Sequence, residues 1–329
     1  MDAADETLGT LGEGAMLRRI FPRLPHAASA LLGPGDDAAV VAAPDGRFVV
    51  TTDTLVHGPD FRMAWSSAFQ LGWKAAASNL ADVAAMGARP SALVVALVAP
   101  ASTPAAWLEE LADGLREGCA ALAPGCGVVG GDLSVSDSLT IAVTALGDLE
   151  GRPPVLRSGA RPGDVVAVSG ELGLAGQGIA LLFARAVDPE GHPDAALAAA
   201  LRPEFDAVLD AQLAPSPPIA DGVRAALAGA TAMLDVSDGL ALDARRIAEA
   251  SGVVIDLDAD AVGSRMALTG GEDHALLATF PADVPLPSGF RPIGRVLPAA
   301  SAPALHVDGR LFDARGGWDP SSDWDGRTG

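Results

Sequence analysis

Tyrosine is absent from this chain, cysteine occurs only twice and lysine only once, at Lys74. The two cysteines, Cys119 and Cys126, are too few for a disulfide framework and have no metal-ligand partners at a useful spacing. We therefore expect reduced, structural thiols and a cytoplasmic protein. The longest apolar runs, such as residues 92–99, fall far short of the roughly 20 residues that span a bilayer. Residues 1–6 are acidic and polar, which does not predict a signal peptide.

Positive charge is also scarce, because 22 Lys and Arg residues stand against 42 Asp and Glu residues and the formal net charge is −20. Nucleic acids and anionic membranes are bound through basic patches, so neither is an expected partner. If the protein handles phosphates, divalent metal ions must supply much of the neutralising charge. The 329 residues, 49% of them hydrophobic, are enough for two domains of ordinary size.

Several common catalytic and phosphate-binding motifs are missing. A Walker loop needs a Gly-Lys-Ser or Gly-Lys-Thr sequence, and Lys74 follows tryptophan and precedes alanine. Residues 169–178 resemble a dinucleotide-binding turn, but they do not form G-x-G-x-x-G, so a tight strand–helix turn is the preferred interpretation. No histidine pair has zinc-binding spacing, and no G-x-S-x-G elbow occurs.

Strand-like and helix-like segments alternate in both halves of the chain, with some neighbouring strand pairs. We expect helices over 14–21, 65–86, 104–122, 178–186 and 240–250, and strands near 38–42, 48–52, 91–99, 127–130, 139–146, 164–169, 232–236, 253–257, 274–280, 292–296 and 305–307. Residues 147–162 are rich in Gly, Pro and Arg and indicate a linker. The pattern predicts two α/β domains with mixed sheets, residues 1–148 and 149–329, followed by a polar tail after about residue 316 whose last residues we expect to be disordered.

Aspartates recur where predicted strands and loops meet, beside glycine or hydroxyl residues. They are Asp36 and Asp37 after a Gly-Pro-Gly turn, Asp53 after Thr51 and Thr52, Asp132 after Gly130 and Gly131, and Asp235 and Asp238 on either side of Ser237. Asp82 lies on the long predicted helix, one turn after Asn79. Mg²⁺ prefers hard oxygen ligands and binds through a few carboxylates plus substrate phosphates. Loop-borne carboxylates that converge on one cleft would hold more than one such ion.

Each aspartate alone also has an ordinary structural explanation. Asp238 is placed like a helix N-cap, Asp36 and Asp37 like turn residues, and Asp53 like a solvated strand end. Asp82 is harder to explain in this way, because a lone carboxylate on an apolar helix face is costly to bury unless it is paired or metal-bound. Only the whole set favours a metal site.

Seven motifs in order along the chain resemble those of the thiamine-monophosphate kinases. They are GDDAA at 35–39, TTDTLV at 51–56, SNLADVAAMG at 78–87, GGD at 130–132, RSGARPGD at 157–164, DVSDGL at 235–240 and GGED at 270–273. The resemblance extends from about Gly12 to Trp318, nearly the whole chain. It implies the two-domain α/β fold of the aminoimidazole ribonucleotide synthetase-like (PurM-like) superfamily. In that fold the N-terminal sheets of two subunits form a dimer-spanning barrel, ATP binds near this interface, and the C-terminal domain completes the active site.

The resemblance also implies an enzyme, a homodimer that phosphorylates thiamine monophosphate to thiamine diphosphate, with ATP as co-substrate and several Mg²⁺ ions. Carried over by motif, the metal ligands are Asp37, Thr51, Thr52, Asp53, Asp82, Asp132, Asp235 and Asp238. The ATP contacts are Gly131, Asp132, Arg157 and Ser237, and the substrate contacts are Asp60, Glu272 and Trp318. The residues implied in catalysis are Asp53, Asp82, Asp132 and Asp238. Trp318 has an alternative explanation, as a tail residue docked on the surface.

Two positions depart from the usual pattern of this family, Asp60 where a histidine is common and His274 where a tyrosine is common. The implied mechanism is direct in-line transfer without a phosphoenzyme, in which positioning and electrostatics do most of the work. Alternatives are another ATP-using enzyme of the superfamily or a non-catalytic nucleotide- or thiamine-binding protein. The reactive cysteine of selenophosphate synthetases, the C-terminal cysteine of the hydrogenase-maturation relative and the Gly-Thr-Lys signature of the aminoimidazole ribonucleotide synthetases are missing.

Overall fold

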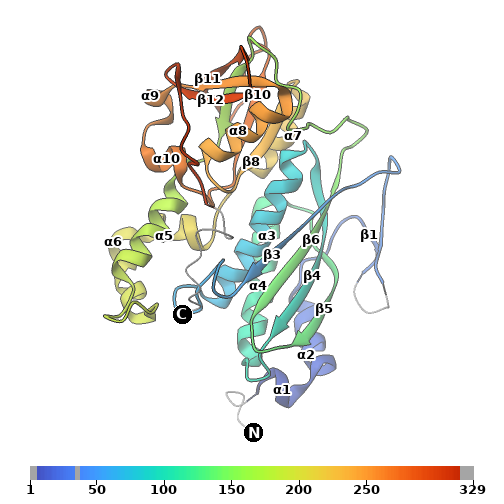
Figure 1. Cartoon of the computed structure of the whole chain (residues 1–329). Coiled ribbons are helices and arrows are strands. Elements are labelled where there is room, and N and C mark those ends of the chain that lie inside the picture. The colour runs from blue at the N-terminus through green and yellow to red at the C-terminus, as the bar shows by residue number, and fades with distance from the viewer. Residues whose placement is uncertain (1–5, 34–37, 319–329) are drawn as a thin grey trace.

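The computed structural model describes residues 6–33 and 38–318, and it contains two large mixed sheets at opposite ends of the molecule (Figure 1). The first has four strands in the order β3-β6-β4-β5. These strands are β3 (Val49–Val56), β4 (Arg89–Ala99), β5 (Val128–Val135) and β6 (Thr140–Asp148). Of the three strand pairs, only β4–β5 is parallel. The strand order places β3 and β5 at the two edges of this sheet.

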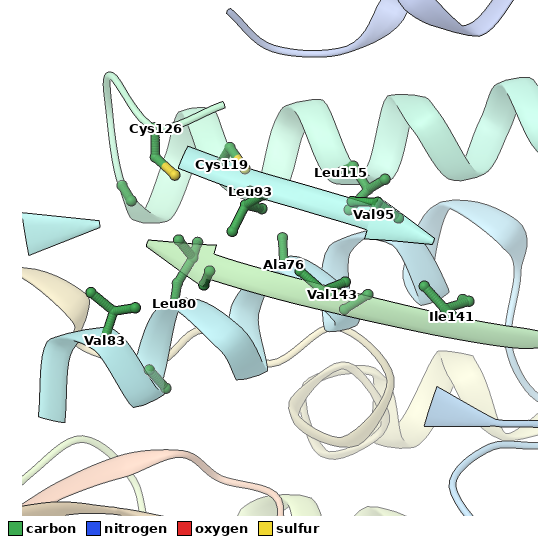
Figure 2. Close-up of a cluster of buried hydrophobic side chains, with 14 of the residues drawn as sticks. Ala76, Leu80, Val83, Leu93, Val95, Leu115, Cys119, Cys126, Ile141 and Val143 are labelled. Carbon is green, nitrogen blue, oxygen red and sulfur yellow. The ribbon is translucent and has the colours of Figure 1, made fainter. Parts of the chain in front are cut away.

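Two long helices, α3 (Ala68–Ala85) and α4 (Ala105–Leu122), pack on one face of the four-stranded sheet. Helix α3 begins at Ser67, which forms a reciprocal capping box with Gln70. Figure 2 shows side chains of α3 and α4 meeting those of β4 and β6, among them Leu80, Leu115 and Ile141. Alternation along β4 from Leu93 onward and along most of β6 explains this layer, because every second side chain there points toward the helices.

The second sheet has seven strands in the order β13-β12-β9-β11-β7-β10-β8. The strands are β7 (Val165–Ser169), β8 (Ala232–Val236), β9 (Val253–Leu257), β10 (Ala275–Phe280), β11 (Phe290–Pro298), β12 (Ala304–Val307) and β13 (Arg310–Leu311). The C-terminal half also contains helices α5 (Leu174–Arg185), α6 (Ala195–Leu213), α7 (Ile219–Leu227), α8 (Leu240–Ser251), α9 (Ala259–Val262) and α10 (Arg265–Thr269). Helices α7, α8 and α9 contact the seven-stranded sheet, while α5 and α6 pack on each other. The N-terminal segment adds α1 (Leu8–Leu11), α2 (Glu13–Ile20), the 3₁₀ turn η2 (Phe21–Arg23) and the small pair β1 (Ala30–Leu32) and β2 (Val40–Val41).

The two halves share a hydrophobic core, and helix α3 lies at their junction. Buried Met233 and Leu276 of the seven-stranded sheet belong to the same cluster as Leu80 of α3. Two tryptophans fasten the halves further, since Trp65 Nε1 donates to Ala186 O at 2.9 Å and Trp73 Nε1 donates to Pro215 O at 2.7 Å. A site built between the sheets is therefore held by well-packed elements on both sides.

The other face of the four-stranded sheet is more open. Val50 and Val94 point away from α3 and α4 and are 64% and 37% exposed. Among the described residues, one end of this face is covered, where Ala30 of β1 and Val41 of β2 pack with Ala92, Val129 and Leu146. An exposed apolar sheet face of this kind is a candidate surface for association with another chain.

The predicted alternation of strands and helices is confirmed, and several details differ. Strand β3 continues to Val56 and β5 continues to Val135, so Asp53 and Asp132 lie within strands and not at their ends. The Ala- and Pro-rich stretch after residue 186 contains helices α6 and α7, which the sequence pattern did not predict. Among the residues that the structure describes, no helix combines the length and the apolar character needed to cross a bilayer.

Candidate active site

Two acidic side chains meet where β3 faces helix α3. Thr51 and Asp53 lie on the same side of β3 as buried Leu55, the side that packs on α3. The Thr51 hydroxyl donates to Asp82 Oδ2 at 2.9 Å, which fixes the carboxylate of α3 against the strand. The period-2 alternation of a strand is what places Thr51 and Asp53 together, with Thr52 on the opposite side.

The seven-stranded sheet contributes Asp235 to the same region. Asp235 is buried on β8, and its Oδ2 lies 3.2 Å from His274 Nδ1. The other ring nitrogen of His274 lies 3.1 Å from the hydroxyl of Ser78 on α3. His274 thus bridges the two halves of the chain and fixes the orientation of Asp235.

The pKa shifts of these carboxylates show that their negative charges repel one another. Burial first, and then the negative charges of Asp235 and Asp53, raise the pKa of Asp82 to about 6 against the opposing effects of Thr51 and His274. Desolvation also raises the pKa of Asp53, and Asp235 and Glu272 add to this shift. A bound cation relieves the mutual repulsion among partly buried carboxylates. A cluster of such carboxylates is therefore a candidate site for a metal ion.

A cavity of about 410 Å³ opens beside these acids. Its lining combines the segment after β3 with helices α3, α5 and α6 and the loop before β10. The lining residues are Pro59, Asp60, Phe61, Arg62, Trp65, Ser66, Lys74, Ile179, Ala180, Phe183, Gln212, Leu213, Gly271, Glu272 and Trp318. All three residues that the sequence implied for substrate, Asp60, Glu272 and Trp318, are therefore brought together in one cavity.

One wall of this cavity is aromatic and was not predicted from the sequence. Trp65 and Phe183 form an edge-to-face pair with ring centroids 4.9 Å apart, and the Arg62 guanidinium lies 5.7 Å from the Phe183 ring centroid. Trp318 is 40% exposed, and its backbone N–H donates to Asp238 O at 2.9 Å. Apolar periodicity alone makes Phe183 look like an ordinary helix residue, so no sequence signal separates it from the core.

The joint between β8 and α8 also adjoins this cavity. The carbonyl of Ser237 accepts from the backbone N–H of Glu272 at 2.7 Å. Asp238 does not cap α8; Gly239 occupies the N-cap position without a side-chain hydrogen bond, and Asp238 pairs with Arg246 at 2.7 Å. Arg157 is exposed, and its carbonyl accepts from the Ser251 hydroxyl at 3.2 Å.

Asp132 does not join Asp53 and Asp82 within one chain, which corrects the expectation that these acids converge. It lies on the edge strand β5, three strand positions from β3, a separation of about 14 Å at the usual strand spacing. Its neighbour Leu133 is buried in the core, so Asp132 points to the open face of the sheet. Thr52 points to that same face, where its hydroxyl donates to Val143 O. Period-2 alternation separates Thr52 from Thr51.

Glycine is required at position 131, since a Cβ there would lie 2.0 Å from Val95 O. Asp37 lies outside the described residues. Within residues 6–33 and 38–318, no three His, Cys, Asp or Glu side chains lie close enough together to hold a metal ion by themselves.

Comparison with known proteins decides the family. The family models described as AIR synthase related protein, N-terminal domain, and AIR synthase related protein, C-terminal domain, match residues 35–149 and 161–282. The thiamine-monophosphate kinase of Mycobacterium tuberculosis is 46% identical over 329 residues, covering 95% of this chain and 92% of that protein. The chain belongs to the thiamine-monophosphate kinase family.

Solved structures agree with this assignment. The thiamine-monophosphate kinase of Stenotrophomonas maltophilia matches with a TM-score of 0.74 at 33% identity, covering 92% of this chain and 98% of that one. AaThiL complexed with AMPPCP and TMP matches with a TM-score of 0.70 at 30% identity, covering 94% of this chain and 98% of that one. The PurM-like fold that the motifs implied is thereby confirmed for this member of the thiamine-monophosphate kinase family.

Proposed function

We propose that this chain transfers the γ-phosphoryl group of ATP to the phosphate of thiamine monophosphate, giving thiamine diphosphate. The observation that carries the proposal is the junction of two unlike environments: repelling carboxylates on β3, α3 and β8, and an adjoining cavity with an aromatic wall. The charge of Glu272, on the cavity side, raises the pKa of Asp53 on the carboxylate side, so the two environments are close. A related protein, AaThiL, has been seen complexed with AMPPCP, an ATP analogue, and TMP.

The cavity suits the thiamine moiety. Its volume of about 410 Å³ is within the usual range for small-molecule sites, and it is lined mainly by apolar and aromatic groups. The thiazolium ring of thiamine carries a positive charge. Carboxylates at Asp60 and Glu272 and the aromatic faces of Trp318 and Phe183 are groups that attract such a flat cation.

The chemistry of the acidic residues fits Mg²⁺. Asp53, Asp82, Asp235 and the Thr51 hydroxyl offer hard oxygen atoms, and Mg²⁺ binds through one or two carboxylates while keeping waters and substrate phosphates. A site of fewer than three clustered acids in the described residues is consistent with that coordination habit. Near Asp82, the buried Asn79 Oδ1 has no hydrogen-bond partner within the described part of the chain, and a water or ligand donor would satisfy it. Bound Mg²⁺ would neutralise the phosphates and the charge on the transferring phosphoryl group.

The chain itself positions the reactants. A phosphate oxygen of the acceptor is already nucleophilic near neutral pH, so no strong general base is needed. His274 is not a free base, because its two nitrogens face Asp235 and Ser78. Its role in this proposal is to fix Asp235, while Asp82 is fixed by Thr51. Catalysis then depends on preorganised charge and on alignment of the two phosphates.

The remaining implied residues support a homodimer. Thr52 and Asp132 point to the open face of the sheet, away from Asp53, and Gly131 directly precedes Asp132 on β5. We propose that two copies join their four-stranded sheets, which would place edge strand β5 of one copy beside edge strand β3 of the other. Asp132 of one chain would then serve the ATP and metal site of its neighbour, together with Arg157 and Ser237, while Asp37 and Asp238 would take part in metal binding. Free Cys119 and Cys126 are compatible with the cytoplasm that the proposal assumes.

A coupled assay of ADP release tests the proposed activity. We expect ADP formation that requires thiamine monophosphate, ATP and Mg²⁺ together, with one thiamine diphosphate formed for each ADP. Thiamine without its phosphate serves as the matched control and should give no turnover. ADP release with no dependence on thiamine monophosphate would contradict the proposal.

A further inference from the structure

The single lysine of the chain is buried at the wall of the cavity. Lys74 lies on α3, and its side chain is 4% exposed. A buried ammonium group is costly unless it is paired and hydrogen-bonded. A lysine at such a position therefore needs hydrogen-bond acceptors or a carboxylate beside it, and the identity of these groups indicates what the lysine does.

Lys74 has three oxygen partners, all from the C-terminal half of the chain. Its ammonium group pairs with Glu272 Oε2 and donates to Gln212 O at 3.2 Å. With the Gln212 amide oriented so that its nitrogen donates to Ala175 O, Gln212 Oε1 accepts from Lys74 at 3.1 Å. These contacts use the donors of the ammonium group and tie α3 to α6 and to the loop before β10.

Glu272 is held in an unusual way at the other end of this pair. Its φ is +72°, a left-handed conformation that is unfavourable for a residue with a side chain. Its backbone N–H donates to Ser237 O, and its side chain is still 39% exposed toward the cavity. Burial would raise the pKa of Glu272, but Lys74 and then His274 lower it, and the net pKa lies below its ordinary value.

Without Lys74, nearby negative charges would repel the carboxylate of Glu272. Glu272 raises the pKa of both Asp60 and Asp53, which shows that all three negative charges interact. Lys74 opposes this repulsion from the protein side. It occupies one carboxylate oxygen, Oε2, and leaves the rest of the group exposed at the cavity.

We infer that Lys74 is a positioning residue for the acceptor substrate: it anchors the Glu272 carboxylate at the cavity wall, ready to meet the cationic thiamine moiety. The inference rests on the proposed function. Lys74 itself touches neither of the reacting phosphates in this assignment, and it acts through Glu272. Loss of Lys74 should therefore weaken binding of thiamine monophosphate and leave ATP binding nearly unchanged.

The test compares Lys74→Met, Glu272→Gln and the double variant with the wild-type protein. We expect Lys74→Met to raise the KM for thiamine monophosphate about tenfold, with a smaller change in kcat and an unchanged KM for ATP. Equilibrium binding of thiamine monophosphate without ATP should weaken by a similar factor. In the Glu272→Gln background, Lys74→Met should cause little further loss, because the carboxylate that it anchors is already gone.

Arg185→Met is the matched control, since it removes a positive charge from α5 at a residue outside the cavity lining and should leave both KM values unchanged. Should Lys74→Met fail to fold, Lys74→Gln, which keeps a donor for Gln212 but no charge, takes its place. Effects of the two substitutions that simply add would overturn the inference, as would an equal loss in ATP binding. If the wild-type protein has no thiamine monophosphate turnover but Lys74 and Glu272 still couple in binding of that ligand, the proposed function fails and the inference about binding stands.

Discussion

Asp82 shows how a residue can be costly for folding and useful for function. Its carboxylate is half-buried on α3, near Asp53 and Asp235, and its pKa of about 6 reflects burial and repulsion. The hydrogen bond from Thr51 compensates for only part of this cost. A carboxyl group whose charged form is destabilised by burial and by neighbouring negative charges is typical of functional sites.

Replacement of Asp82 by asparagine should separate these two effects. We expect Asp82→Asn to lower kcat about 10²-fold or more, because a charge placed to interact with the transferring group is lost. Thermal stability measured without Mg²⁺ should stay the same or rise, because one of the repelling charges has been removed. Glu110→Gln, which removes a negative charge from an exposed residue of α4, is the control. Full activity in Asp82→Asn would remove this acid from the site.

The raised pKa of Asp82 also predicts how stability depends on pH. Its folded-state pKa, about 6, is above the ordinary value of 3.8, so the folded state holds the proton more tightly than the unfolded state. The stabilisation is present below about pH 4 and is lost as the pH rises through about 6, because the carboxylate must then ionise inside the protein. Urea unfolding in EDTA from pH 4 to 7 should show this loss in wild type and a flatter curve in Asp82→Asn. Parallel curves for the two proteins would contradict the assignment.

At this scale the sequence predicted some residues better than others. Alternation along a strand is enough to place Thr51 and Asp53 on one side of β3 and Thr52 on the other, whereas motif resemblance groups all three as ligands. Asp60, Glu272 and Trp318 do line one cavity. Lys74 carried no signal beyond being the only lysine, because its importance lies in partners about 140 and 200 residues away.

Among the elements, the contact between α3 and α4 depends most directly on residue size. At Gly72 a Cβ would lie 2.0 Å from Leu111 O, and at Gly114 it would lie 2.0 Å from Phe69 O. The two helices therefore approach each other backbone to backbone. Because α3 also carries Lys74 and Asp82, this contact sets the position of the site.

Alanine at either glycine should force the helices apart. We expect Gly72→Ala and Gly114→Ala each to destabilise the protein by about 2–3 kcal/mol, measured by urea unfolding, because backbone atoms cannot yield as a flexible side chain can. Gly14→Ala is the matched control. It lies in helix α2 with only the end of the Arg18 side chain nearby, so alanine should stabilise that helix by about 0.5–1 kcal/mol. If all three substitutions changed the free energy of unfolding by the same amount, the close packing of α3 on α4 would be contradicted.

The predictability of the elements follows from their chemistry. Strands β8 and β9 are short, mainly apolar segments with one aspartate each, Asp235 and Asp256, and their predicted boundaries match. The sequence pattern does not predict helix α6, because Pro203 lies inside it and proline normally ends a helix. In the structure the helix is kinked at Phe205, which has non-helical backbone angles. Tertiary packing against α5 holds this kinked helix together, and local sequence preference carries no record of such packing.

For the whole molecule, the order of strands in the first sheet is the decisive feature, and it cannot be derived from the sequence pattern. Alternation identifies β3, β4, β5 and β6 but not their neighbours. With β3 and β5 at opposite edges, Asp53 and Asp132 of one chain cannot bind the same ion, because their strands are about 14 Å apart. A site that used both acids would have to take them from two chains, as in the proposed homodimer, and joining the sheets would cover the open apolar face around Val50 and Val94.

Mixing two inactive variants tests this arrangement directly. Asp53→Asn and Asp132→Asn should each be inactive alone and should each sediment as a dimer. A heterodimer of the two carries both defects in one site and none in the other. Random exchange of subunits makes half of the dimers mixed, each with one intact site, so about a quarter of wild-type activity should return. If Asp132 instead acts within its own chain, both sites of the mixed dimer stay defective and no activity returns, whatever the dimer content measured by ultracentrifugation.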